Sequence, residues 1–112
     1  MAAIAAMIES LREREYLMGT VRTLVAERDR LLRELPLTRI LRPHPTRANF
    51  MLCDVIGMDA RELRDKLADN GILIRHYGTP LLRDRLRISV GRPEQNDVLL
   101  ATLRHIAAEA GV

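Results

Sequence analysis

The feature that most constrains the fold is a proline-free segment of helical pattern at the start of the chain. Ala is abundant there, and the first proline is Pro36, which we expect to end the helix. Apolar side chains recur at three- and four-residue spacing with Arg28 as a polar interruption; they are Leu17, Val21, Leu24, Leu31 and Leu35. We therefore expect helix over residues 2–35, with a break near Ser10. The heptad pattern does not persist, so packing on the chain's own sheet is favoured over a coiled coil.

Three later segments have clear strand patterns, and a fourth fits a short edge strand. The clearest is residues 48–56, whose nearly continuous apolar run predicts burial on both faces of a sheet. Residues 72–77 are rich in β-branched side chains, and residues 86–90 follow after so short a connection that these two strands should pair antiparallel. Residues 37–41 fit a short edge strand before Pro43 and Pro45.

Two more helices complete the expected order. Asp59 and Glu62 have the spacing of a capping box, and Asn70 with Gly71 ends that helix. The last helix should start at Pro93, end at Gly111 and bury the stripe Leu99, Leu103, Ile106 and Ala110. The order α-β-α-β-β-α predicts one two-layer α+β domain over residues 1–112, with helices on a small mixed sheet and residues 1–35 as a long helical lead-in.

Charge and hydropathy exclude several classes of function. The chain has 112 residues and a net charge of +3, and of its 18 basic residues all but Lys66 are arginine. The arginines are spread among 15 acidic residues without a block of like charge, so we do not expect nucleic-acid binding. No run approaches the ~20 apolar residues of a membrane span. The apolar start has no basic region before it, so we expect no signal peptide and a cytoplasmic location.

Motifs for metal binding or nucleophilic catalysis are absent from the sequence. Cys53 is alone and lies in an apolar run, which favours a buried structural thiol. The histidines are scattered, so we expect no metal site. His44 is expected in an exposed loop, and His76 on the surface of a strand, with a ligand contact as the alternative.

Arg85, directly before the strand at residues 86–90, and Arg87 within it fall on one face, because side chains alternate along extended chain. An arginine fixed in this way can hold a carboxylate through two parallel hydrogen bonds. For Arg87 we favour carboxylate binding over a surface ion pair, and for Arg85 a solvated position at the sheet edge.

The order and the amino-acid sequences of three segments resemble the C-terminal small domain of class I/II aminotransferases, most of all the histidinol-phosphate aminotransferase branch. The segments are Ala48-Asn49-Phe50, Asn70 to Arg75, and Leu86 to Gly91 followed by Pro93-Glu94-Gln95-Asn96. The resemblance covers nearly the whole chain, and Leu86 to Gly91 is its most specific part. The long first helix also fits the helix that precedes this domain.

The resemblance implies a fold type I pyridoxal-phosphate enzyme that moves an amino group between an amino acid or amino phosphate and a 2-oxo acid. By motif position, Arg87 would bind the α-carboxylate of the substrate. Arg75 would assist in recognising the substrate's side chain or phosphate, and Asn49 would lie near the edge of the active site. For Asn49 a hydrogen-bonding role at the strand end is the alternative, and Phe50 is expected in the core.

The sequence departs from the family in one respect that matters for catalysis. The family binds pyridoxal phosphate through a Schiff-base lysine upstream of the matched segments, whereas Lys66 lies in the expected helix at 59–70 and fits no cofactor motif. We therefore assign no catalytic or cofactor-binding residue, and expect the chain alone to be inactive and to bind no pyridoxal phosphate. It reads as the severed C-terminal part of an enzyme that is a homodimer when complete.

Two alternatives remain from the sequence. One is a stand-alone, non-catalytic binding module with this fold. An exposed apolar surface where a large domain once packed would favour self-association, whereas a monomer without such a surface would argue for the independent module. The other is a fragment of a related pyridoxal-phosphate-dependent decarboxylase that acts on a phospho-amino acid.

Overall fold

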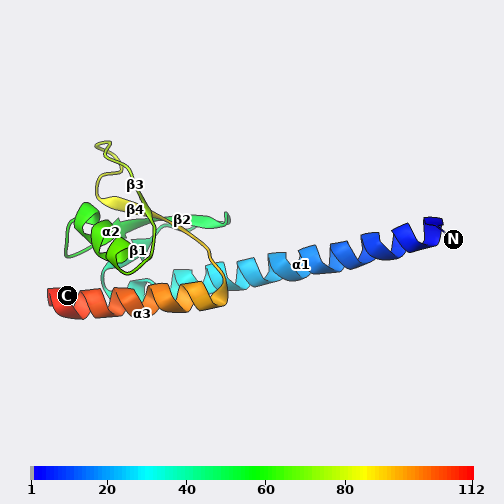
Figure 1. Cartoon of the computed structure of the whole chain (residues 1–112). Coiled ribbons are helices and arrows are strands. Elements are labelled where there is room, and N and C mark those ends of the chain that lie inside the picture. The colour runs from blue at the N-terminus through cyan, green and yellow to red at the C-terminus, as the bar shows by residue number, and fades with distance from the viewer. Residues whose placement is uncertain (1) are drawn as a thin grey trace.

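A computed structural model describes residues 2–112 of the backbone and the side chains from Met18 onward. A long helix runs past a small sheet, and a second helix lies along its C-terminal part (Figure 1). The elements are α1 (Ala2–Glu34), a 3₁₀ turn η1 (Pro36–Thr38), β1 (Leu41–Pro43), β2 (Phe50–Val55), α2 (Ala60–Asp69), β3 (Arg75–His76), β4 (Arg85–Ser89) and α3 (Pro93–Ala110).

The sheet has the strand order β1-β2-β4-β3, and each neighbouring pair is antiparallel. The predicted antiparallel pairing of the last two strands is confirmed, but the predicted mixed sheet is wrong. The physical reason is the position of β4. The strands that flank α2, β2 and β3, run in the same direction but do not touch, because β4 inserts between them.

Several predicted boundaries are also wrong. The edge strand is β1, a few residues beyond the predicted segment 37–41, because Pro36–Thr38 form a 3₁₀ turn that Arg39 ends with a φ of 66°. The strand predicted over residues 72–77 is reduced to Arg75–His76, since only these two residues pair with β4. Helix α1 is continuous through Ser10, where a break was predicted.

The helices of the described chain cover one face of the sheet, which confirms the two-layer α+β arrangement. A single apolar core joins them: Leu31 and Leu35 of α1, Leu63 and Leu67 of α2, Leu99, Leu103 and Ile106 of α3, and Met51, Cys53, Leu86 and Ile88 of the strands. Burial of β2 on both faces was predicted wrongly, because the alternate side chains of β2 face away from the helices and Phe50 is 38% exposed.

Two local predictions from the sequence are confirmed, the cap of α2 by Asp59 and the burial of Cys53. The backbone N–H of Glu62 donates to the Asp59 carboxylate at 3.2 Å, which caps α2. Cys53 is fully buried, and burial raises the pKa of its thiol to about 12. At the end of α3, by contrast, Ala110 is exposed instead of completing the apolar stripe.

Arg28, the polar interruption in the stripe of α1, ties the helix to the β1–β2 connection. Its Nη1 donates to the backbone oxygen of Arg47 at 2.9 Å. The predicted stripe is buried only at its C-terminal end, because Val21 is 56% exposed, and the side chain of Leu17 lies outside the described residues.

Within the described residues, no helix has both the length and the apolar character needed to span a membrane.

Candidate functional site

The side of the sheet that faces away from the helices carries most of the polar strand residues. We call it the outer face. Strand register and the alternation of side chains assign to it Arg42, His44, Phe50, Leu52, Asp54, Arg75, Tyr77, Arg85, Arg87 and Ser89. The residues of the outer face include four arginines and one carboxylate, that of Asp54, so the net positive charge of this face attracts anions.

Arg87 lies at the centre of the outer face. In the strand register it stands between Leu52 of β2 and Arg75 of β3. Its guanidinium carbon lies 4.1 Å from the centroid of the Phe50 ring, a cation–π contact that holds the group in one plane. Among the described residues, its buried Nε has no hydrogen-bond partner. A buried donor without an acceptor is costly, so an anion that accepts this hydrogen bond would be stabilised here.

Arg75 and Arg87 converge on the hydroxyl of Tyr77. The Nη1 of Arg87 is 3.4 Å from that oxygen, a long hydrogen bond. Hydrogen bonding from Arg87, and then from Arg75, lowers the pKa of the Tyr77 hydroxyl. The structure thus brings together two of the three residues predicted to bind substrate, and adds Tyr77, which sequence reasoning missed.

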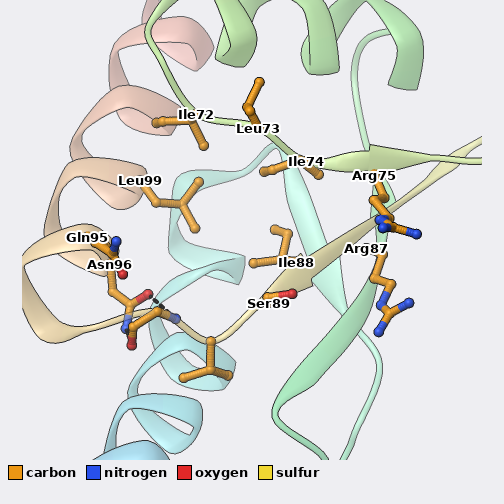
Figure 2. A pocket seen from close by; sticks show the side chains of 12 residues that line it. Ile72, Leu73, Ile74, Arg75, Arg87, Ile88, Ser89, Gln95, Asn96 and Leu99 are labelled. Atoms are coloured by element: carbon orange, nitrogen blue, oxygen red, sulfur yellow. Dashed lines mark hydrogen bonds between the residues drawn. The ribbon is translucent and has the colours of Figure 1, made fainter.

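Arg75 and Arg87 also line a groove of about 610 Å³ at the edge of the sheet. Figure 2 shows the two arginines at one end and the apolar side chains of Ile72 and Leu99 at the other. The groove opens because β3 and β4 pair only as far as Arg75 and Arg87, so that the preceding segment, residues 72–74, diverges from β4. It offers a cationic end and an apolar wall.

Asn49, the third predicted residue, lies elsewhere. It lines a separate cavity of about 160 Å³ with Leu24 and Arg28 of α1, not the groove of Arg75 and Arg87. Its backbone oxygen accepts a hydrogen bond from the N–H of Val90 at 2.8 Å.

Arg85 is not the free, solvated residue predicted from its edge position. Its Nε donates to the Asp54 carboxylate at 2.8 Å, and His44 Nε2 lies 3.0 Å from the same oxygen. Hydrogen bonding with His44, and then with Arg85, lowers the pKa of Asp54 despite the opposing effect of burial. The signal that could have revealed this cluster was the single carboxylate within the apolar run of β2.

This cluster predicts a dependence of stability on pH. The pKa of Asp54 in the folded chain is below its ordinary value of 3.8. The carboxylate therefore contributes fully to the free energy of unfolding above pH 3.8, and this contribution is lost as the pH falls through the pKa of the folded chain. We expect the melting temperature of Asp54→Asn to fall less between pH 5 and pH 2.5 than that of the unsubstituted chain, by up to about 5 °C. Thermal melts followed by circular dichroism measure this. Equal falls in the two proteins would contradict it.

Lys66 lies in the helical layer, not on the outer face. It is on α2, with its side chain 38% exposed and its Nζ 3.7 Å from Glu62 Oε1. The described residues therefore do not fit covalent attachment of pyridoxal phosphate beside Arg87. Nor do they include a cluster of His, Cys, Asp or Glu side chains suited to a metal.

Comparison with known proteins agrees with this fold. The profile of the family described as aminotransferase class I and II matches residues 1–103, so the chain belongs to that family. Within it, the chain is similar to histidinol-phosphate aminotransferases. It is 44% identical over 109 residues to that of Roseiflexus castenholzii, covering 95% of this chain and 29% of the relative. For that of Dehalococcoides mccartyi (strain 195) the identity is 41% over 102 residues, covering 91% and 28%.

Solved structures give the same result. The histidinol-phosphate aminotransferase of Sinorhizobium meliloti, in complex with pyridoxal-5'-phosphate, superposes with a TM-score of 0.75 at 32% identity, over 94% of this chain and 29% of that one. The enzyme of Clostridium acetobutylicum superposes with a TM-score of 0.79 at 24% identity, over 88% of this chain and 30% of that one, and supports the fold. The chain thus spans less than a third of the length of these relatives.

Proposed function

We propose that this chain forms the substrate-binding small domain of a pyridoxal-phosphate-dependent aminotransferase similar to histidinol-phosphate aminotransferase. The complete enzyme would move an amino group between an amino acid or amino phosphate and a 2-oxo acid. The observation that carries the proposal is Arg87, held over Phe50 on the face of the sheet that the described helices leave uncovered, with its Nε lacking an acceptor among the described residues.

Each candidate residue has a proposed role. The planar guanidinium of Arg87 would bind the α-carboxylate of the substrate through two parallel hydrogen bonds and so fix its orientation. Arg75, adjacent in the sheet and facing the same tyrosine, would bind the second anionic group, a side-chain carboxylate or a phosphate. Asn49 directly precedes β2 and would act at the margin of the site, where its backbone oxygen accepts a hydrogen bond from Val90.

Pyridoxal phosphate supplies the electron sink for this class of reaction when it is bound in the complete enzyme. In this chain Lys66 is the single candidate for covalent attachment, and it is paired with Glu62 in the helical layer. We expect no stoichiometric, site-specific adduct on Lys66 when the chain is mixed with pyridoxal phosphate and reduced with borohydride. Mass spectrometry checks this, and a stoichiometric adduct on Lys66 would contradict the proposed assignment.

The proposal is tested in a chimaera. The 109-residue segment of the Roseiflexus enzyme that matches this chain is replaced by the chain itself. We expect the chimaera to retain aminotransferase activity. Arg87→Lys in the chimaera should lower kcat/KM for the amino acid substrate by about ten- to a hundredfold, the effect of losing a bidentate, charge-assisted contact. Arg104→Lys is the matched control, since that side chain is exposed on α3 away from the outer face. Equal activity of the two variants would refute the role of Arg87.

A second candidate function is supported by one structural similarity. The L-threonine-O-3-phosphate decarboxylase of Porphyromonas gingivalis superposes with a TM-score of 0.61 at 25% identity, over 78% of this chain. A decarboxylase domain of that kind would use the same two arginines for a carboxylate and a phosphate. Assaying the same chimaera for release of carbon dioxide separates the two reactions.

The proposed partners of the complete enzyme are its amino-acid or amino-phosphate substrate and a second copy of itself. The cytoplasmic location stays a prediction from the sequence. The apolar side chains exposed on α1 count against the alternative of a stand-alone binding module, since Met18 is 52% and Val21 56% exposed. A monomer in sedimentation experiments that binds no carboxylate would favour that alternative.

A further inference from the structure

Helices α1 and α3 lie side by side and run in the same direction (Figure 1). Where α3 begins, their contact is polar. The Nη2 of Arg30 donates to Glu27 Oε1 at 2.7 Å, and its Nη1 donates to Asp97 Oδ1 at 2.7 Å. Asn96 Nδ2 donates to the same Glu27 oxygen at 3.1 Å. The first turn of α3 is therefore attached to one turn of α1 by charge-assisted hydrogen bonds.

Asn96 also holds the residue that follows β4. Its Oδ1 accepts a hydrogen bond from the N–H of Gly91 at 3.1 Å, and its Nδ2 donates to the Gly91 oxygen at 2.9 Å. The asparagine is 2% exposed and is drawn in Figure 2 with its hydrogen bond to this turn. Its amide therefore bridges α1 and the end of β4, and no water can replace these bonds easily at a buried site.

Glu27 takes part in this contact as a carboxylate. Burial raises its pKa, but hydrogen bonds from Arg30 and Asn96 outweigh this effect and lower the pKa below its ordinary value of 4.5. An ionised acceptor makes the hydrogen bond from Asn96 stronger than one between neutral groups. At neutral pH Glu27 is therefore ionised, and it accepts the hydrogen bond from Asn96 as a carboxylate.

The end of β4 is connected to the position of Arg87. The N–H of Val90, the residue before Gly91, donates to the backbone oxygen of Asn49. Asn49 directly precedes Phe50, the first residue of β2. Phe50 pairs with Ser89 in the sheet and supports the Arg87 guanidinium with its ring. A displacement of Gly91 would therefore move the aromatic support of Arg87.

We propose that Asn96 is a positioning residue for Arg87. Through its hydrogen bonds to Glu27 of α1 and to Gly91 at the end of β4, it fixes the place of the Arg87 guanidinium relative to the long helix. The inference deepens the proposed function, and it rests on that function because there Arg87 is the group that binds the substrate's carboxylate. The physical coupling itself can be measured without a ligand.

The experiment uses the whole chain labelled with ¹⁵N, and records the Nε–Hε resonance of Arg87 together with its titration by succinate. We expect Glu27→Ala to shift this resonance and to weaken succinate binding by about threefold or more. Glu27→Gln retains an acceptor oxygen and should stay within about twofold of the unsubstituted chain. Glu34→Ala is the matched control, because Glu34 lies on the same helix and pairs with Arg30 and Arg104 but not with Asn96.

Melting temperatures separate positioning from a general loss of stability. Glu27→Ala and Glu34→Ala should both melt earlier, but only the first should change Arg87. An unchanged Arg87 resonance in folded Glu27→Ala would overturn the inference. If that variant does not fold, Asn96→Asp replaces it. It keeps the acceptor for the Gly91 N–H but loses the donor to Glu27 and to the Gly91 oxygen, and the same resonance then decides. If the unsubstituted chain binds no succinate, the proposed function fails, while the resonance still tests the coupling.

Discussion

Replacing Arg87 by lysine is expected to weaken the binding of succinate or inorganic phosphate to this chain by about tenfold or more. Lysine keeps the positive charge but not the planar fork of donors, so it cannot offer two parallel hydrogen bonds to a carboxylate. It also cannot place a donor where the buried Nε of Arg87 lacks an acceptor, and it makes a different contact with the Phe50 ring. A hydrogen bond to a charged group is worth about 1.5–3 kcal/mol, which corresponds to a factor of about 10 to 150.

The measurement is a titration followed by the ¹⁵N and ¹H shifts of the arginine side chains. A dissociation constant near 1 mM is expected for the unsubstituted chain, as one fixed arginine supplies only a few kcal/mol. Arg75→Lys should weaken phosphate more than succinate if Arg75 meets the second anion. Arg83→Lys is the control, because Arg83 lies in the loop before β4 and meets His76 only through its backbone oxygen. Binding by Arg87→Lys as tight as that of the unsubstituted chain would contradict the assignment.

The second large effect is expected at Gly91, where alanine should lower the melting temperature by about 5–15 °C. A Cβ at this position would lie 2.8 Å from Gln95 Oε1 and 3.2 Å from Asn96 Oδ1. Both oxygens are held in place, since Gln95 accepts from the N–H of Arg92 at 2.9 Å and Asn96 accepts from the N–H of Gly91 at 3.1 Å. The added methyl group must displace these side chains, at a cost of about 1–3 kcal/mol.

Gly78→Ala is the matched control for this prediction, because a Cβ there meets no heavy atom within 4 Å. Its melting temperature should stay within about 2 °C of the unsubstituted chain. Differential scanning calorimetry distinguishes the two outcomes. A Gly91→Ala chain as stable as Gly78→Ala would show that the contact between the turn and α3 is loose, contrary to the geometry described above.

Local sequence patterns predicted the helices better than the sheet. The capping residues Asp59 and Gly111 and the apolar stripe of α3 act within a few residues of the chain, so they can be read directly from the sequence. The position of β4 between β2 and β3 depends on contacts between distant segments, and no local pattern records it. The apolar run of β2 suggested burial on both faces because hydropathy does not reveal which faces the helices will cover.

The candidate site shows the same division. Arg87 was predicted from its place on a strand together with the family resemblance, and Arg75 from the resemblance alone; the register of β3 and β4 sets them side by side. Tyr77 was missed because nothing in the sequence indicates that its hydroxyl meets Arg87. Asn49 was grouped with the arginines, whereas in the structure it lines a cavity beside α1. The interaction of Asn96 with Glu27 joins residues 69 positions apart and appears only in three dimensions.

The long helix acts geometrically as a lever. Helix α1 begins at Ala2, and the contact with Asn96 is made from Glu27, about 37 Å further along the axis at 1.5 Å per residue. A tilt of about 10° around that contact would displace the start of the helix by about 6.5 Å, while the atoms at Asn96 hardly move. A small rearrangement beside β4 is therefore amplified into a larger displacement at the beginning of α1.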